Sequence, residues 1–168
     1  MITDPFLLSV LACAMLALLF RHVLGAKRQR TRGDAPPASI VVDGSNVMHW
    51  GGDPSIKVLN RVLQDIAAHG LTPVVYFDAN VGYRLMDRFC DAKEMARLTK
   101  LREDQICVVD KGVVADGELL QCAADQGLRV VSNDRYRDWR LRYPFLKKKG
   151  RVVRGTYDAG AVRWQGPL

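Results

Sequence analysis

The sequence has 168 residues, of which 48% are hydrophobic, and 25 Lys and Arg against 18 Asp and Glu give a formal net charge of +7. This length suits a short leader plus one domain. The four cysteines are scattered without a Cys-x-x-Cys pair, and the three histidines lie at no ligand spacing from them. The pattern argues against a zinc site and indicates reduced cysteines in a reducing compartment.

An apolar segment, residues 6–20, is the first element along the chain, and Ser9 is its only polar residue. The segment is shorter than the ~20 residues of a spanning helix, but it reaches that length if Arg21 and His22 extend to the membrane interface. The basic residues nearby all follow the run, so the positive-inside rule places the main domain in the cytoplasm. We therefore expect a single-pass transmembrane helix.

Two other interpretations of this segment are weaker. A cleaved signal peptide would carry positive charge before the apolar run, where the sequence has Asp4. A peripheral amphipathic helix would need a polar face, which the run lacks. The sequence thus divides into a membrane anchor, a basic and proline-containing linker, and one domain, at residues 1–25, 26–38 and 39–168.

Beyond the linker, β-branched runs alternate with segments of helical spacing. The first helical segment has Asp53 as a cap before it and Gly70 as a stop after it. Repeated strand–helix units with short joints predict a parallel sheet with helices on both faces. The expected strands are 39–43, 72–77, 105–109 and 128–132, and an edge strand or hairpin is expected at 151–156 and 161–164. The expected helices are 54–69, 81–102 in one or two pieces, 116–126 and a short one after Asn133.

Acidic and amide side chains follow two of these strands. Asp43 ends the first strand with Asn46 shortly after it, and Asn133 and Asp134 follow the fourth strand. Ligands bind outside the carboxyl ends of strands in open α/β sheets, so these side chains would meet if the two strands are neighbours. A helix beginning near Asn133 would also put Asp138 on the same face as Asp134, one turn away. Two acids so placed repel each other unless a cation lies between them, which predicts a metal site.

Three further aspartates lie near the same edge of the predicted sheet. Asp116 opens a helix, where an isolated Asp is ordinarily a cap or a first-turn acid. It nevertheless precedes Asp134 by one helix and one strand, the distance that returns the chain to the same edge. Asp78 and Asp110 follow the second and third strands, and we interpret each as a turn residue.

Positive charge is concentrated in residues 129–154, where ten basic residues accompany only two acids, Asp134 and Asp138. A solvated basic face is the ordinary explanation of such a stretch. Here the only acids are the proposed metal ligands, so the pattern favours nucleic-acid binding. The candidate substrate-binding arginines are Arg135, Arg137 and Arg140.

Three motifs resemble the NYN-domain branch of the PIN-like ribonucleases, and most closely its Regnase type: Asp43-Gly44-Ser45-Asn46-Val47, Asp116, and Ser132-Asn133-Asp134-Arg135-Tyr136-Arg137-Asp138. The resemblance covers about residues 39–139. It implies a three-layer α/β/α sandwich with a mostly parallel central sheet, and endonucleolytic cleavage of RNA with Mg²⁺, or else Mn²⁺, held by acids. The acids carried over as catalytic residues and metal ligands are Asp43, Asp116, Asp134 and Asp138, and Asn46 and Asn133 are carried over as supporting, substrate-binding residues.

The chain departs from the family pattern at Ala115, where the family often has a further acid beside Asp116, and no Cys-Cys-Cys-His finger follows the domain. The expected partners are RNA in single-stranded or loop regions and the membrane, and a homodimer is compatible with the sequence. A catalytically inactive, membrane-tethered RNA-binding adaptor is the alternative. The missing acid favours the adaptor and the four remaining acids disfavour it.

Overall fold

The computed structural model describes residues 37–168. The predicted anchor and nearly all of the linker fall in residues 1–36, outside the described residues. Within the described part, no helix combines the length and the apolar character that crossing a bilayer requires.

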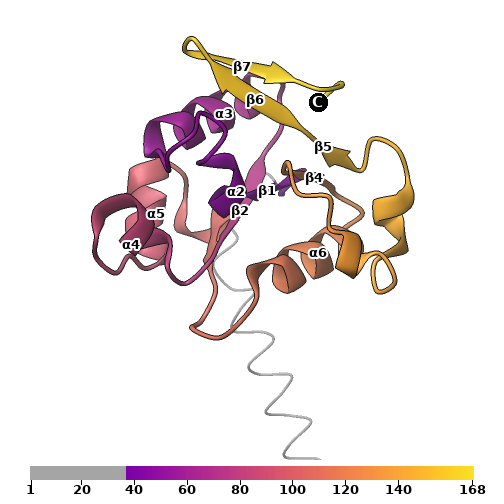
Figure 1. Ribbon diagram of the computed structural model, residues 1–168, viewed down its shortest axis with the longest axis horizontal. Helices are drawn as coiled ribbons and strands as arrows, with labels where there is room; N and C mark the ends of the chain where they lie inside the picture. Colours follow the sequence, from indigo (N-terminus) through magenta and orange to yellow (C-terminus); the bar gives the residue numbers. More distant parts are fainter. Residues whose placement is uncertain (1–36) are drawn as a thin grey trace, which may run out of the picture. The chain divides into compact units, whose positions relative to one another are not determined.

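A five-stranded sheet forms the centre of the domain, and all its strand pairs are parallel, which confirms the sheet expected from the sequence (Figure 1). The chain runs outward from β1 (Ile40–Asp43) through β2 (Pro73–Phe77) to β3 (Ile106–Val108). It then crosses to the other side of β1 to form β4 (Arg129–Val131). The carboxyl ends of β1 and β4 are therefore the switch point of the sheet, where ligands bind in open α/β folds. A fifth strand, β5 (Val152–Val153), pairs with β4, so the spatial order is β3-β2-β1-β4-β5.

Side chains of β1 alternate between two hydrophobic clusters, one on each face of the sheet. Ile40 and Val42 belong to the cluster that includes the helices α2 (Gly44–Val47), α3 (Ile56–Ala68), α4 (Val81–Met86) and α5 (Ala92–Thr99). Val41 belongs to the opposite cluster, with α6 (Ala115–Asp125) and the short 3-10 helices η2 (Arg137–Trp139) and η3 (Pro144–Lys147). The three layers are those of the predicted α/β/α sandwich. One more 3-10 helix, η1 (Glu103–Gln105), precedes β3.

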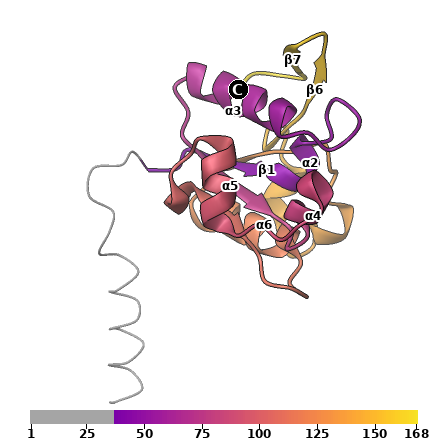
Figure 2. The ribbon, with the colours of Figure 1, turned by 90° about the vertical axis from the view of Figure 1, so that its left-hand side faces the viewer.

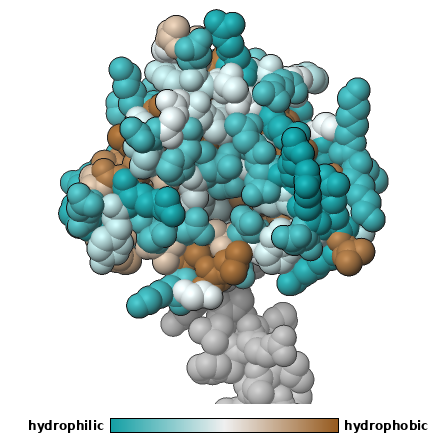
Figure 3. All heavy atoms as spheres, in the orientation of Figure 1, coloured by the Kyte–Doolittle hydropathy of each residue, from teal (hydrophilic) through white to brown (hydrophobic). Residues whose placement is uncertain are grey.

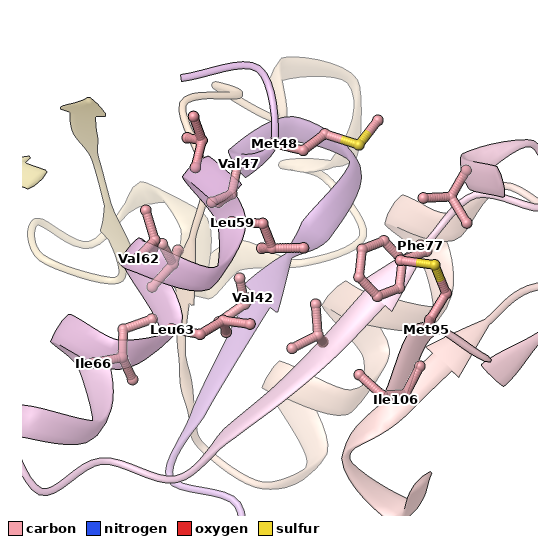
Figure 4. Close-up of a cluster of buried hydrophobic side chains, with 14 of the residues drawn as sticks. Val42, Val47, Met48, Leu59, Val62, Leu63, Ile66, Phe77, Met95 and Ile106 are labelled. Atoms are coloured by element: carbon pink, nitrogen blue, oxygen red, sulfur yellow. The ribbon is translucent and has the colours of Figure 1, made fainter. Parts of the chain in front are cut away.

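The larger cluster is built on one face of α3. The buried residues of α3 recur at helical spacing and lie near Val42. From there the cluster continues to Phe77 and Met95 (Figure 4). Gly44 follows β1 directly beneath the Phe77 ring, where an added Cβ would come within 2.2 Å of a ring carbon. The chain can therefore turn from β1 into α2 only because residue 44 has no side chain. The buried face of α3 consists of Val58, Leu59, Val62, Leu63 and Ile66.

The last two strands, β6 (Gly155–Asp158) and β7 (Ala161–Trp164), form an antiparallel hairpin separate from the main sheet. The hairpin lies beside α3 in both views (Figures 1 and 2). Trp164 packs edge-to-face on Trp50 at 5.6 Å between ring centroids and donates a hydrogen bond to Asp65 on α3. The edge segment expected over residues 151–156 is thus divided between β5 and this hairpin.

Two local predictions are wrong. Ser55, and not Asp53, caps α3, because the Ser55 hydroxyl accepts the backbone N–H of Val58 while Asp53 is exposed. No α-helix begins near Asn133. The chain instead makes a tight turn to Tyr136, whose φ of 46° is left-handed, and only then enters η2. Asp134 and Asp138 are therefore not one helical turn apart on a common face.

Candidate active site at the carboxyl ends of β1 and β4

Asp43 lies at the switch point as the last residue of β1 and the N-cap of α2. Its Oδ1 accepts the backbone N–H of Asn46 at 3.0 Å, and its Oδ2 accepts the hydroxyls of Ser132 and Tyr136, both at 2.9 Å. Burial raises the pKa of Asp43, and these three hydrogen bonds oppose that rise. The donors therefore orient a carboxylate whose charge would otherwise be unfavourable in this position.

The turn after β4 brings Asp134 to the same place. Ser132 Oγ accepts the backbone N–H of Asp134 at 3.0 Å while its hydroxyl donates to Asp43. Asp134 Oδ1 in turn accepts the backbone N–H of Tyr136 at 2.6 Å, which closes the turn. This geometry sends the Tyr136 ring into the core, where it is 2% exposed, and leaves Asp134 exposed to solvent.

Asp78 and Asp116 complete a group of four acids. The strand register pairs Asp43 with Tyr76, so Asp78 lies just beyond the carboxyl end of β2, and its backbone N–H donates to Ser45 Oγ at 2.9 Å. Asp116 is half-buried in the first turn of α6. Burial and then repulsion from Asp43, Asp134 and Asp78 raise the pKa of Asp116 to about 6. We call Asp43, Asp78, Asp116 and Asp134 the acidic cluster.

The structure places Asp138 apart from this group. Asp138 is exposed on η2, and the charges that chiefly raise the pKa of Asp116 do not include it. The same 3-10 helix instead contributes Trp139, whose indole hydrogen bonds to Asp116 and lowers its pKa. A catalytic or metal-binding role for Asp138 stays a prediction from the sequence.

The two asparagines predicted to bind substrate hold the backbone of the site together. Asn46 Oδ1 accepts the Trp50 indole N–H at 3.0 Å and the backbone N–H of Asn133 at 2.9 Å. The Asn133 side chain donates to the carbonyl of Gly155 at 2.8 Å and accepts its N–H at 3.2 Å. These bonds join α2, the turn after β4 and the hairpin, so both side chains act here as positioning groups.

Within the described part of the chain, the acidic cluster has no ion-paired cation to offset its charge. No ion pair within residues 37–168 involves any of its four members. Carboxylate oxygens are the ligands that Mg²⁺ and Mn²⁺ prefer, and a cation would relieve the repulsion that raises the pKa of Asp116. No three Asp, Glu, His or Cys side chains in the described chain lie close enough to hold one ion jointly. The donors thus fit an ion that takes one or two carboxylates directly and keeps several waters, as Mg²⁺ does.

Cations gather next to the cluster, at the β4–β5 side of the sheet, around a hollow of about 400 Å³ that we call the basic hollow. The Nε atoms of Arg140 and Arg154 are buried there without a hydrogen-bond partner in the described chain. Arg137 is exposed and does not line the hollow. The basic residues that line it are Arg135, Arg140, Lys147, Lys148, Lys149 and Arg154.

Three residues have roles in the site that the sequence analysis did not assign to them. Asp78 was interpreted as a turn residue, yet its charge acts on both Asp43 and Asp116. Ser132 and Tyr136 orient Asp43. The position of Asp78 directly after a strand that neighbours β1 was the available signal, whereas the inward direction of Tyr136 depends on a left-handed backbone that the sequence did not reveal.

Comparison with known proteins gives a family and a fold. The family model described as the Zc3h12a-like ribonuclease NYN domain matches residues 37–158. No curated protein matches the sequence significantly. Two solved structures of nuclear protein-only RNase P 2 (PRORP2) from Arabidopsis thaliana are similar, with TM-scores of 0.63 and 0.61 at 17% and 18% identity. Each match covers 99% of this chain but only 37% or 38% of the PRORP2 chain, and at this identity it shows the fold alone.

We predict that Asp116→Asn stabilises the metal-free protein at pH 7.5. The pKa of Asp116 is raised in the folded state, so its contribution to stability is full below about pH 4 and is lost as the pH rises through about 6. After allowance for solvent screening of this half-exposed group, the gain should be on the order of 1 kcal/mol. Urea unfolding with chelator should show the gain at pH 7.5 and none at pH 4. Glu118→Gln, a charge removal in the same helical turn, should give no gain, and an equal gain in both variants would contradict the explanation.

Proposed function

The chain belongs to the Zc3h12a-like ribonuclease NYN family, and from that premise we propose that it cuts RNA internally by divalent-metal-dependent hydrolysis at the acidic cluster. The observation that carries the proposal is that four acids, from the ends of β1 and β2, the first turn of α6 and the turn after β4, lie near enough for the charges of the other three to act on Asp116, without an ion-pair partner in the described residues. Such a group is costly for a folded protein unless a cation or a reacting group uses it.

We propose Mg²⁺ as the ion, with Mn²⁺ as the alternative. When bound, the ion supplies positive charge to the scissile phosphate and lowers the pKa of a coordinated water. Asp43 and Asp134 are the candidates for direct contact with the ion. Asp116 and Asp78 would hold its waters, and Asp78 brings the number of clustered acids to four in a chain that has Ala115 where the family often has an acid.

The protein's own residues would orient these acids. Ser132 and Tyr136 hold one oxygen of Asp43 and leave its Oδ1 with only the Asn46 amide. The Ser45 hydroxyl holds the backbone of Asp78 against α2. Fixed acids of this kind lower the reorganisation needed when charge develops on the reacting phosphate.

The basic hollow would hold the RNA backbone on one side of the scissile bond. Its six cations have no ion-pair partner in residues 37–168, so they are available to phosphates. We therefore propose Arg135 and Arg140 as phosphate ligands, and Arg137 remains a candidate through its exposure on η2.

Asp134→Asn should lower the cleavage rate on a mixed RNA substrate by at least about 100-fold while the protein stays folded. Asparagine keeps an oxygen that can accept the Tyr136 N–H and removes only the charge. Asp125→Asn, at the exposed far end of α6, is the matched control and should cleave normally. Asp78→Asn and Asp138→Asn tested in parallel will show which of these two acids belongs to the site.

Excess chelator should abolish cleavage by the native protein, and Mg²⁺ or Mn²⁺ should restore it. Undiminished cleavage by Asp134→Asn, or by native protein in chelator, would refute metal-dependent hydrolysis at this cluster. RNA binding with no cleavage under any metal would instead support the catalytically inactive adaptor.

Replacing Lys147, Lys148 and Lys149 together by Ala should weaken RNA binding evenly across sequences. Each lost phosphate contact should lower the slope of log affinity against log salt by about 0.7 for single strands. The single-turnover rate at saturating RNA should barely change, because these lysines line the basic hollow beside the acidic cluster and are not members of it. Normal affinity and salt slope with a collapsed saturated rate would place them in the reaction or in the fold instead.

We further propose that the apolar segment 6–20 anchors the protein in a membrane with the nuclease domain in the cytoplasm. Full-length protein should then stay with membranes through washes in high salt and in alkaline carbonate. A variant without residues 1–32 should be released as a folded domain. Release of the full-length protein by salt alone would show electrostatic attachment and exclude a spanning helix.

A further inference from the structure

A second hollow, the aromatic hollow, lies at the opposite end of the same sheet edge, beyond the carboxyl ends of β2 and β3. Its volume of about 590 Å³ is in the range of ligand pockets, ~300–1,000 Å³. Asp78 of the acidic cluster immediately precedes two of its lining residues, Ala79 and Asn80. The acidic cluster therefore has the basic hollow on one side and the aromatic hollow on the other.

Two aromatic rings line this hollow and remain open to solvent. Tyr83 is 56% exposed and Phe89 is 60% exposed, although large apolar side chains are ordinarily buried. Neither ring stacks on another aromatic side chain within residues 37–168. Figure 3 shows further hydrophobic side chains gathered around the nearby loop from β3 into α6, on a face that is otherwise largely hydrophilic.

The backbone that carries these rings is held in place. Arg88 makes a two-pronged ion pair with Glu94, and Asp91 caps α5 by accepting the Glu94 N–H at 2.8 Å. Gly82 lets the turn pack directly on α4, because a Cβ there would lie 2.4 Å from the carbonyl oxygen of Arg88. Phe89 is therefore exposed on a fastened turn, so that little backbone entropy is lost when a ligand binds to its ring.

Four polar or charged residues line the hollow, and two of them, Asn80 and Lys111, are free to bind a ligand, whereas Asp91 is engaged as the cap of α5. Asn80 stands at the N-cap of α4, yet its side chain makes no capping hydrogen bond. Lys111 forms no ion pair in the described chain. An amide offers both a donor and an acceptor to the edge of a flat heterocycle, and a lysine offers a cation to a phosphate.

We propose that the aromatic hollow binds an unpaired nucleobase of the RNA by stacking on Tyr83 and Phe89, with Asn80 at the base edge. The inference rests on the proposed function for its position beside the scissile phosphate. A base engages the rings only when it is unstacked, so the hollow selects single-stranded RNA and loops. The RNA then crosses the sheet edge from the basic hollow, over the acidic cluster, to the aromatic hollow.

The test compares two ligands that share a backbone. One is an oligouridine of about twelve nucleotides, and the other is an oligomer of the same length in which stable abasic analogues replace every nucleoside. Full-length protein is titrated in chelator, so that no cleavage occurs. Tyr83→Ala combined with Phe89→Ala should weaken binding of oligouridine by about 5- to 100-fold and leave binding of the abasic oligomer within about twofold.

Two variants serve as controls. Tyr83→Phe keeps the ring and should bind oligouridine like the native protein. The triple lysine variant of the basic hollow should weaken both oligomers equally, because it acts through phosphates. Thermal unfolding of each variant, compared with the native protein, checks that the fold is intact.

Equal weakening of both oligomers by the ring variant, or no weakening of either, would overturn the inference. A change in oligomeric state with unchanged base dependence would also overturn it and make the hollow a contact between copies of the chain. Since the titration involves no cleavage, a protein that shows the ring-dependent base preference but never cuts RNA would refute the proposed function and leave this inference standing.

Discussion

The carboxylate of Asp43 is held in a buried position because three hydrogen-bond donors, from α2, Ser132 and Tyr136, converge on its two oxygens. Each donor comes from a segment that must be correctly placed for the bond to form. The same bonds that orient the charge therefore fasten β1, α2 and the turn after β4 to one another. The positions of Asp134 and of the Asn46–Asn133 bond follow from this arrangement.

Charge is separated along the edge of the sheet and is not neutralised within the domain. The acids lie at the centre and the cations of the basic hollow lie on the β4–β5 side, with no ion pair between the two groups in residues 37–168. The cations attract a polyanion that the acids alone would repel. Proximity of opposite charges without pairing is expected where each group is needed by a ligand and not by the fold.

The sequence predicted the sheet and most of the cluster because both depend on local patterns. β-branched runs mark β1, β2 and β4, and the family motifs mark Asp43, Asp116 and Asp134. Asp78 was assigned to a turn because a lone Asp after a strand has that ordinary explanation. Only the register of β1 with β2 and the effect of its charge on the pKa of Asp43 show that it lies near Asp43. The turn from Asn133 to Tyr136 was predicted as a helix because the spacing of Asp134 and Asp138, at positions i and i+4, suits a helix. The left-handed backbone of Tyr136 instead allows its ring to be buried and its hydroxyl to donate to Asp43.

The two outer strands of the sheet are short, three residues in β3 and two in β5. An exposed edge offers unpaired backbone groups to any strand of another molecule, and the length of the edge limits how many such bonds can form. Arg154 follows β5 directly and adds charge to that border. The five-stranded sheet therefore offers a strand of another molecule few backbone groups to pair with at either border.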